Sequence, residues 1–351
     1  MKNGFWTGIC GLALMAGLAT AAYAEDASVD VGLDAPITVE RGGLKKIALF
    51  IEIGTNSAVQ ATVTGAREEA EKHGIQVDVF DARFDIAKQY SQMQNALVGD
   101  YDAWIVAAIE GNQICDMAAR EAPNAGIPVA VVTMSICGNS VNEGESLYSP
   151  GTLTYIGGNE SPAAFRSVIM QAVKDHPGPQ KIALLTGQEL HPITQAFDKA
   201  VADVVAAHPE VEVVATYRTD YSPAMNQDKV QTLLQAFPDV DAIVGVYTNM
   251  SKGAVPALEA AGKLGEVRVY EAGGTEWSIE ALKNGWISAT TGYYRGKAAE
   301  TAVKLLVDAY DGKPVPKVVL NDGQDLRDGQ AEGEVAIITK DNLDGYVPEA
   351  P

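Results

Sequence analysis

Residues 240–249, VDAIVGVYTN, repeat in outline the construction of residues 101–112, YDAWIVAAIEGN. Each stretch begins with an acidic and a small residue, continues with an apolar run, and ends in a polar cluster that opens a segment of helical pattern. An unbroken apolar run is typical of a strand buried on both faces of a parallel sheet. The chain therefore builds the same strand-to-helix unit twice.

Strand-like runs alternate with segments of helical pattern around both stretches. In the first half these runs are residues 45–53, 74–82, 102–109 and 127–134. The pattern restarts with QKIALLTGQ at 180–188, which repeats KKIALFIEI at 45–53, and it continues at 211–220, 240–249 and 267–274. Regular alternation of this kind predicts parallel sheets joined by right-handed crossovers. We expect an α/β fold of two doubly wound parallel-sheet lobes.

Three polar stretches are expected to carry the chain between the lobes as a three-stranded hinge. They are residues 154–162, 288–296 and 317–329. The resulting N-terminal lobe comprises residues 45–155 plus 293–320, and the C-terminal lobe comprises 156–292 plus 321–345. Such a hinge lets two nearly rigid bodies open and close. The tail DGYVPEAP, residues 344–351, is expected to be loose.

Residues 1–24 have the pattern of a signal peptide. Lys2 precedes an apolar run, and Ala22-Tyr23-Ala24 provides small residues where cleavage is expected, before the acidic Glu25. A membrane anchor is the alternative, because the apolar run is nearly long enough to span a bilayer. We expect export to the periplasm.

The charge balance excludes some classes of partner. The chain has 26 Lys and Arg against 46 Asp and Glu, a net charge of −20, and loss of Lys2 with the signal peptide would make it −21. So acidic a surface repels nucleic acid and anionic lipid. Cys115 and Cys137 remain after cleavage, and in an oxidising compartment they can form a disulfide worth roughly 3 kcal/mol. The alternative is two small buried residues.

The sequence contains no pattern of a catalytic, metal or cofactor site. It has no P-loop, no G-x-S-x-G, no H-E-x-x-H and no zinc-type spacing of Cys and His. His191 could act as a base, but no serine or cysteine partner is indicated. We therefore predict that the protein is not an enzyme and uses no cofactor or metal.

Polar residues follow the predicted strands, where ligands bind in open α/β sheets. These residues suit a cleft that closes on a small polar solute. Each could instead cap a helix, as Asn56 could at the start of the following helix. The candidates are Glu52, Asn56, Glu110, Thr133 and Met134 in the first lobe, and His191, Tyr221, Tyr247, Thr248 and Gly273 in the second.

From about residue 45 to residue 343 the chain resembles periplasmic solute-binding proteins of the ribose type, the type I fold of ABC sugar importers. The resemblance rests on residues 45–82, on NAGIPVAVV (124–132), on residues 237–263 and on AIITKDNLD (336–344). It implies a monomer that captures a solute and delivers it to an ABC permease. It also implies contacts from most of the candidates above, and from Tyr293 at the second crossing.

The chain departs from the family at several implied contacts. Sugar binders of this type place Asp-Arg where Thr133 and Met134 lie, and Asp where Gly273 lies. Those losses remove much of the bidentate recognition of hydroxyl groups, so a modified sugar, a polyol or another small polar solute fits as well as a common sugar. An aromatic set with carboxylates could also bind a cationic amine. A role as a sensing accessory for a membrane histidine kinase or chemoreceptor is a further alternative.

Overall fold

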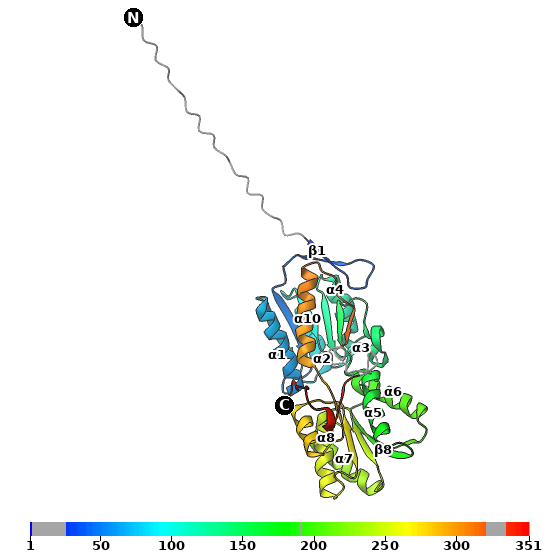
Figure 1. Cartoon of the computed structure of the whole chain (residues 1–351). Helices are drawn as coiled ribbons and strands as arrows, with labels where there is room; N and C mark the ends of the chain where they lie inside the picture. The colour runs from blue at the N-terminus through cyan, green and yellow to red at the C-terminus, as the bar shows by residue number, and fades with distance from the viewer. Residues whose placement is uncertain (2–25, 190, 321–334, 351) are drawn as a thin grey trace.

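The computed structural model describes residues 1, 26–189, 191–320 and 335–350, and it contains two large parallel sheets (Figure 1). The first sheet has six strands in the order β13-β7-β6-β5-β3-β4, and every neighbouring pair is parallel. Its strands are β3 (Lys46–Ile51), β4 (Gln76–Asp81), β5 (Ala103–Val106), β6 (Val129–Thr133), β7 (Thr154–Gly157) and β13 (Val318–Leu320). This sheet and the helices packed on it are called the first lobe.

Helices cover both faces of the first sheet. α1 (Ser57–Lys72) and α10 (Arg295–Tyr310) lie side by side on one face, and α2 (Ile86–Leu97) and α3 (Gly111–Asp116) pack on the other (Figure 1). Gly65 sets the close approach of α1 to α10, because a Cβ there would lie 2.1 Å from the Gly296 carbonyl oxygen. α10 therefore returns to the first lobe after the chain has built the second.

The second sheet has four parallel strands in the order β11-β10-β8-β9. Its strands are β8 (Gln180–Thr186), β9 (Val211–Arg218), β10 (Ala242–Gly245) and β11 (Arg268–Glu271). Its helices are α5 (Pro162–Asp175), α6 (Pro192–Ala207), α7 (Pro223–Ala236), α8 (Thr248–Ala260) and α9 (Glu276–Asn284). One hydrophobic cluster joins these elements, which are called the second lobe.

The two similar sequence stretches form β5 and β10, and each strand has a neighbour on both sides in its sheet. Asp102, before β5, accepts the backbone N–H groups of Lys45 and Lys46 through Oδ2, both at 2.8 Å. Asp241, before β10, accepts the N–H of Lys181 at 2.7 Å. In both lobes the acidic residue thus satisfies a backbone donor at the start of the neighbouring strand. The prediction of two doubly wound lobes is confirmed.

The chain passes between the lobes where the sequence analysis placed its first two crossings. One connection joins β7 to α5, and another joins β12 (Thr290–Thr291) to α10. Asn159 Nδ2 donates to the Gly292 carbonyl oxygen at 2.9 Å and ties the two connections together. The third predicted crossing runs from β13 into residues outside the described part, and β14 (Ile337–Ile338) then pairs antiparallel with β12. The lobe boundaries stay a prediction.

An N-terminal hairpin lies before the predicted start of the fold at residue 45. β1 (Asp26–Val29) pairs antiparallel with β2 (Ile37–Glu40), and the apolar side chains of both strands join the core of the first lobe beside α10. The shorter elements are a π-helix (Met117–Glu121), α4 (Ala122–Asn124) and 3-10 helices at Asn139–Val141, Gly144–Leu147 and Lys340–Asn342.

The expectation of a loose C-terminal tail is wrong for residues 344–350. The Glu349 carboxylate accepts the backbone N–H groups of Gly296 at 2.6 Å and Lys297 at 3.1 Å. A carboxylate is favourable there because unpaired N–H groups point out of the N-terminus of α10. The Ala350 carbonyl oxygen accepts the N–H of Glu276 in α9 at 2.8 Å, so the tail bridges both lobes.

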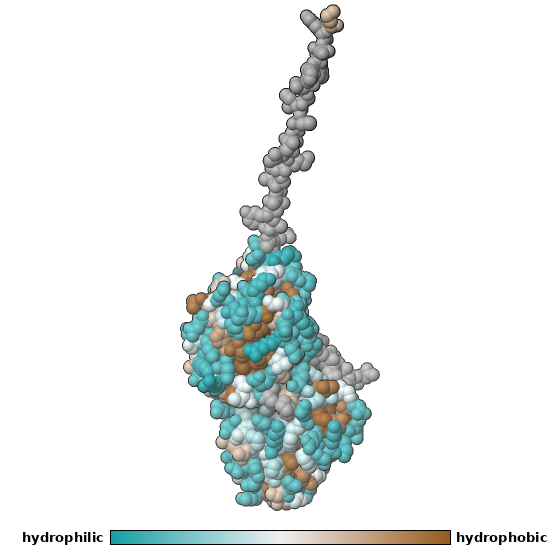
Figure 2. All heavy atoms as spheres, turned by 90° about the vertical axis from the view of Figure 1, so that its left-hand side faces the viewer, coloured by the Kyte–Doolittle hydropathy of each residue, from teal (hydrophilic) through white to brown (hydrophobic). Residues whose placement is uncertain are grey.

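Hydrophilic residues cover most of the face shown in Figure 2, and hydrophobic surface gathers in a few patches, the largest on the upper lobe. None of the helices in the described ranges is long and apolar enough to cross a membrane. The predicted signal peptide, apart from Met1, lies outside the described residues.

Candidate functional site

A cavity of about 500 Å³ lies between the lobes, at the carboxyl ends of strands from both sheets. Its volume suits a small solute. The first lobe contributes Glu52, Ile53, Thr55, Asn56, Val59, Phe84, Met134 and Arg295, and the second contributes His191, Ile193, Asp220, Tyr221, Ser222, Pro223, Tyr247 and Asn249. Glu160 and Tyr293 complete the lining from the two connections.

A buried ion pair anchors the first-lobe side of the cavity. Glu52 follows β3 and is 3% exposed, and Arg295 begins α10 and is 7% exposed. Arg295 Nη2 donates to Glu52 Oε1 at 2.5 Å, and its Nε donates to Thr62 Oγ1 at 3.2 Å. Burial opposes the charge on Arg295, but the neighbouring carboxylates raise the pKa of the guanidinium above its ordinary value. Glu52 Oε2 is buried without a protein partner, so it can accept a hydrogen bond from a solute.

Glu160 and Tyr293 meet at the hinge. The Tyr293 hydroxyl donates to Glu160 Oε1, while Glu160 Oε2 is buried and has no protein partner. Burial raises the pKa of the Glu160 carboxyl to about 7, against the opposing attraction of Arg295. Burial, followed by the charge of Glu160, raises the pKa of Tyr293 well above its usual range, so its phenol stays a neutral donor.

Aromatic rings line the second-lobe side. The Tyr221 hydroxyl lies 3.4 Å from His191 Nδ1, and the His191 ring stacks on Phe84 of the first lobe with centroids 5.9 Å apart. Burial lowers the pKa of His191 to about 4 against the attraction of Glu52 and Glu110, so the imidazole is neutral at neutral pH. Burial raises the pKa of Tyr221 to about 12. These rings offer apolar faces and uncharged polar atoms to a solute.

Asn56 serves both as a helix cap and as part of the cavity wall. Its Oδ1 accepts the N–H groups of Ala58 at 2.9 Å and Val59 at 3.2 Å, which caps α1. The same oxygen accepts the Tyr247 hydroxyl of the second lobe at 3.5 Å. Met134, after β6, also lines the cavity. Seven predicted positions thus come together: Glu52, Asn56, Met134, His191, Tyr221, Tyr247 and Tyr293.

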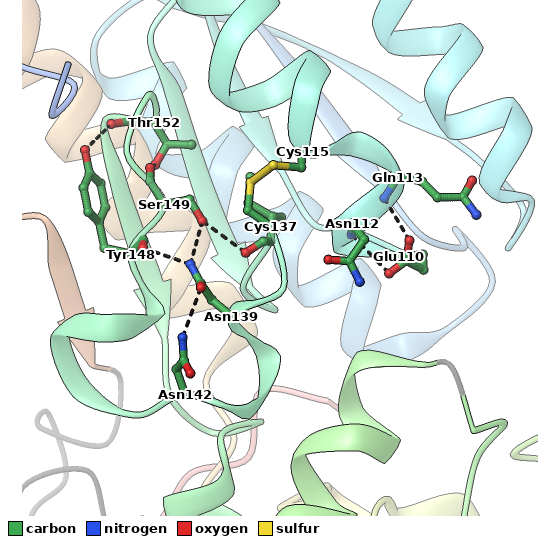
Figure 3. Close-up of a disulfide and its surroundings, with 11 residues drawn as sticks. Glu110, Asn112, Gln113, Cys115, Cys137, Asn139, Asn142, Tyr148, Ser149 and Thr152 are labelled. Atoms are coloured by element: carbon green, nitrogen blue, oxygen red, sulfur yellow. Dashed lines mark hydrogen bonds between the residues drawn. A yellow bond between two sulfur atoms is a disulfide. The ribbon is translucent and has the colours of Figure 1, made fainter. Parts of the chain in front are cut away.

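Two first-lobe candidates lie outside the cavity lining. The Glu110 carboxylate accepts the N–H groups of Asn112 at 3.1 Å and Gln113 at 2.8 Å, so it caps α3 (Figure 3). Thr133 lines a separate void of about 10 Å³ that shares Tyr293 and Arg295 with the main cavity. Its carbonyl oxygen accepts the Tyr155 hydroxyl at 2.8 Å.

Two second-lobe candidates, Thr248 and Gly273, lie outside the cavity lining, beside the buried carboxylate of Glu271. Thr248 Oγ1 donates to Glu271 Oε1 at 3.2 Å, and Ser278 Oγ donates to the same oxygen at 2.5 Å. A Cβ at residue 273 would lie 1.9 Å from Thr248 Oγ1, so glycine permits this contact. Burial raises the pKa of Glu271. Thr248 and Gly273 are therefore residues of types that could contact a ligand, but in this structure they pack around Glu271 at the end of β11.

Sequence reasoning missed three residues that shape the cavity. Arg295 stands in SATTGYYRG and Glu160 in GGNESP, both at predicted crossings, and Phe84 follows β4. Arg295 and Glu160 could have been found, because each is a charged residue in a stretch that was expected to form part of the hinge. Phe84 had no such signal, because its φ of 60° and its stacking on His191 depend on the turn after β4.

A disulfide borders the first-lobe rim. Cys115 of α3 and Cys137 are joined (Figure 3), which leaves neither as a free thiol. The segment after Cys137 reaches the second lobe, where Ser140 Oγ donates to Gln195 Oε1 at 3.0 Å. Further along it, Arg166 of α5 forms an ion pair with Glu143 at 2.8 Å.

Comparisons with known proteins agree with this geometry. A sequence model of the periplasmic binding protein domain matches residues 47–314. The chain belongs to this family. The ribose import binding protein of Bacillus subtilis is 24% identical over 79% of this chain and 86% of its own length. The Escherichia coli ribose import binding protein is 26% identical over 79% and 90%, respectively. The resemblance to the ribose type is confirmed, and these relatives are binding proteins rather than enzymes.

Solved structures show the same fold. A solute-binding protein of an ABC transporter from Bacillus halodurans, with bound myo-inositol, has a TM-score of 0.74 at 22% identity, over 88% of this chain and 99% of its own. A myo-inositol binding protein from Caulobacter has a TM-score of 0.73 at 23% identity, over 87% and 96%. The type I periplasmic binding protein fold is confirmed.

Proposed function

We propose that this protein is the solute-binding component of an ABC importer and captures a sugar, modified sugar or polyol between its lobes. The observation that carries the proposal is the buried Glu52–Arg295 pair, because both residues line the cavity and one Glu52 oxygen has no protein partner. A hydroxyl group both donates and accepts, so a carboxylate beside a guanidinium can bind neighbouring hydroxyls of one solute. Aromatic faces opposite this pair suit the apolar faces of a ring.

Closure of the lobes would bury the solute. Contacts across the cleft support this motion: Phe84 with His191, Asn56 with Tyr247, and Glu143 with Arg166. They come from opposite lobes that are joined at a hinge, as in hinged closure around ligands. The closed form would then dock on the permease. Export by residues 1–24, location in the periplasm, a monomeric state and the absence of catalysis complete the proposal.

The relatives narrow the class of solute. Their names include ribose import and xylitol binding, and two of the similar structures carry myo-inositol or glycerol. All four are small polyhydroxylated compounds. No observation favours the sensing role over transport.

A binding screen tests the proposal. The exported protein would be heated with pentoses, hexoses, linear polyols and cyclitols, and hits would be measured by titration calorimetry. A solute at a hundred times its Kd should add about 2.7 kcal/mol to the free energy of unfolding. Deletion of the gene should abolish uptake of the same solute. A panel without a stabilising sugar or polyol would contradict the proposal.

Replacement of two cavity tyrosines tests the assigned site. Tyr221→Ala with Tyr247→Ala should weaken the binding of the hit about 10- to 100-fold, because two rings leave the solute contact. Tyr217→Ala is the matched control, since that tyrosine lies on β9 of the same lobe outside the cavity lining. Unchanged affinity in the double variant would contradict the assignment of the cavity as the binding site.

A further inference from the structure

The charges that line the cavity do not balance. Glu52 and Glu160 place two carboxyls against a single guanidinium, Arg295, among the described lining residues. Asp220 adds a third carboxyl, and His191 adds no positive charge because burial keeps it neutral. The site is thus acidic by at least one charge when Glu160 is ionised, which is unfavourable for a buried group.

The excess of charge coincides with unused hydrogen-bond acceptors. Arg295 occupies one oxygen of Glu52, and Tyr293 occupies one oxygen of Glu160. The second oxygen of each carboxyl is buried without a protein partner. A neutral hydroxyl can donate to such an oxygen but leaves the charge uncompensated. A protonated amine supplies both the donors and the opposite charge.

Two tyrosine rings lie on the side of the cavity where Tyr293 donates to Glu160. Tyr247 and Tyr293 lie with their ring centroids 6.5 Å apart. Burial raises the pKa of both phenols, and the charge of Glu160 adds to the effect on each while Arg295 opposes it, as expected if both charged groups lie near the rings. The face of a tyrosine ring attracts a cation. The Glu160 carboxylate and the tyrosine rings therefore both favour a positive charge on the solute at this end of the cavity.

We propose that the cavity selects a polyhydroxylated solute that carries a protonated amine, such as an amino sugar or an aminocyclitol, and that Glu160 determines this specificity. The ammonium group lies against Glu160 Oε2 and the tyrosine rings, and hydroxyl groups of the same solute contact Glu52 and Arg295. This inference rests on the proposed function and names its class of solute.

The test compares neutral and amino members of matched pairs. D-Glucose would be titrated against D-glucosamine, and myo-inositol against an aminodeoxyinositol, by calorimetry at pH 7 on the exported protein. In at least one pair the amino compound should bind at least ten times more tightly. Glu160→Gln keeps the shape of the side chain and an acceptor for Tyr293, and it should bring the ratio close to one.

Two variants control the experiment. Asp228→Asn removes an exposed carboxylate of α7 that does not line the cavity, and it should keep the wild-type ratio. Glu160→Asp keeps the charge, and it should retain part of the preference. The wild-type comparison needs no variant, so it remains decisive if Glu160→Gln does not fold.

The outcomes separate this inference from the proposed function. Tighter binding of the neutral member in every pair, or an unchanged ratio in Glu160→Gln, would overturn the inference and leave the proposed function intact. Failure of all sugars, polyols and amino compounds to bind would overturn both.

Discussion

The two lobes share one construction but bring different chemistry to the cavity between them. Asp102 and Asp241 hold equivalent places beside β5 and β10. The strand ends differ. The first lobe supplies the Glu52–Arg295 ion pair, whereas the second supplies the rings of Tyr221, Tyr247 and His191, with Asp220 as its carboxylate. The repeated fold thus determines where the site lies. The residues at the strand ends determine which contacts each lobe can make with a solute.

The first-lobe and second-lobe residues of the cavity are expected to affect different properties, namely the stability of the protein and the closure of the cleft. The charged pair lies within the first lobe, between β3 and α10, so it forms whether the cleft is open or closed. Second-lobe side chains contact the first lobe only when the lobes approach, as Tyr247 contacts Asn56. We therefore expect first-lobe changes to lower the stability of the protein, and second-lobe changes to affect mainly affinity and closure.

The largest effect is expected from Arg295→Met. It leaves Glu52 buried without its counter-charge and should lower the free energy of unfolding by about 3–5 kcal/mol, measured by urea denaturation. The double variant Glu52→Gln with Arg295→Met removes both charges and should recover part of that loss. An equal loss in the single and double variants would show that the charge pair is not what stabilises this lobe edge.

Loss of the disulfide is expected to be next in size. Cys115→Ser with Cys137→Ser opens a link between residues 22 apart in sequence, which should cost about 3 kcal/mol in unfolding free energy. The second lobe contains no cysteine, so its own stability should not respond to a reducing agent. Thermal unfolding with and without dithiothreitol checks this. No change in the melting temperature would contradict the prediction.

His191 is an exception among the second-lobe residues, because its burial should make the stability of the protein depend on pH. Because the pKa of the folded state is about 4 and the ordinary value is 6.5, the unfolded chain binds more protons on this residue between those pH values. The difference in unfolding free energy between wild type and His191→Gln should therefore shrink as pH falls from 6.5 to 4, by on the order of 2–3 kcal/mol. Denaturation at several pH values measures this difference. A constant difference would contradict the burial of a neutral His191.

The smallest effect is expected at the rim of the cleft. Arg166→Gln removes the partly exposed ion pair with Glu143 across the lobes, and it should weaken solute affinity by about 0.2–1 kcal/mol, mainly through the closed form. The contribution should fall with added salt. Lys263→Gln removes a partly exposed ion pair with Glu266 within the second lobe and is the control. An equal loss of affinity in both variants would argue against a closing role for the rim pair.

Local patterns in the sequence were sufficient to predict the lobes and part of the cavity lining. Apolar runs and helical periodicity each lie within a short stretch of chain, so they predicted the repeated strands and the first two crossings. Residue positions at strand ends, together with the family resemblance that supplied Tyr293, predicted seven of the lining residues. Glu110 and Thr248 also follow strands, but Glu110 caps α3 and Thr248 donates to Glu271, because the same polar atoms can bond to other protein groups or to a solute.

Only the tertiary structure decided which distant residues meet. Arg295 pairs with Glu52 across 243 residues, and Tyr293 reaches Glu160 across 133. These contacts depend on the return of α10 to the first lobe and on the meeting of two connections at the hinge. Such pairs cannot be read from periodicity or spacing. They join two segments that are far apart in the sequence, and the pattern of each segment gives no information about its partner. The sequence by itself therefore determined two similar lobes with a cleft between them, and the folded chain determined the charge within that cleft.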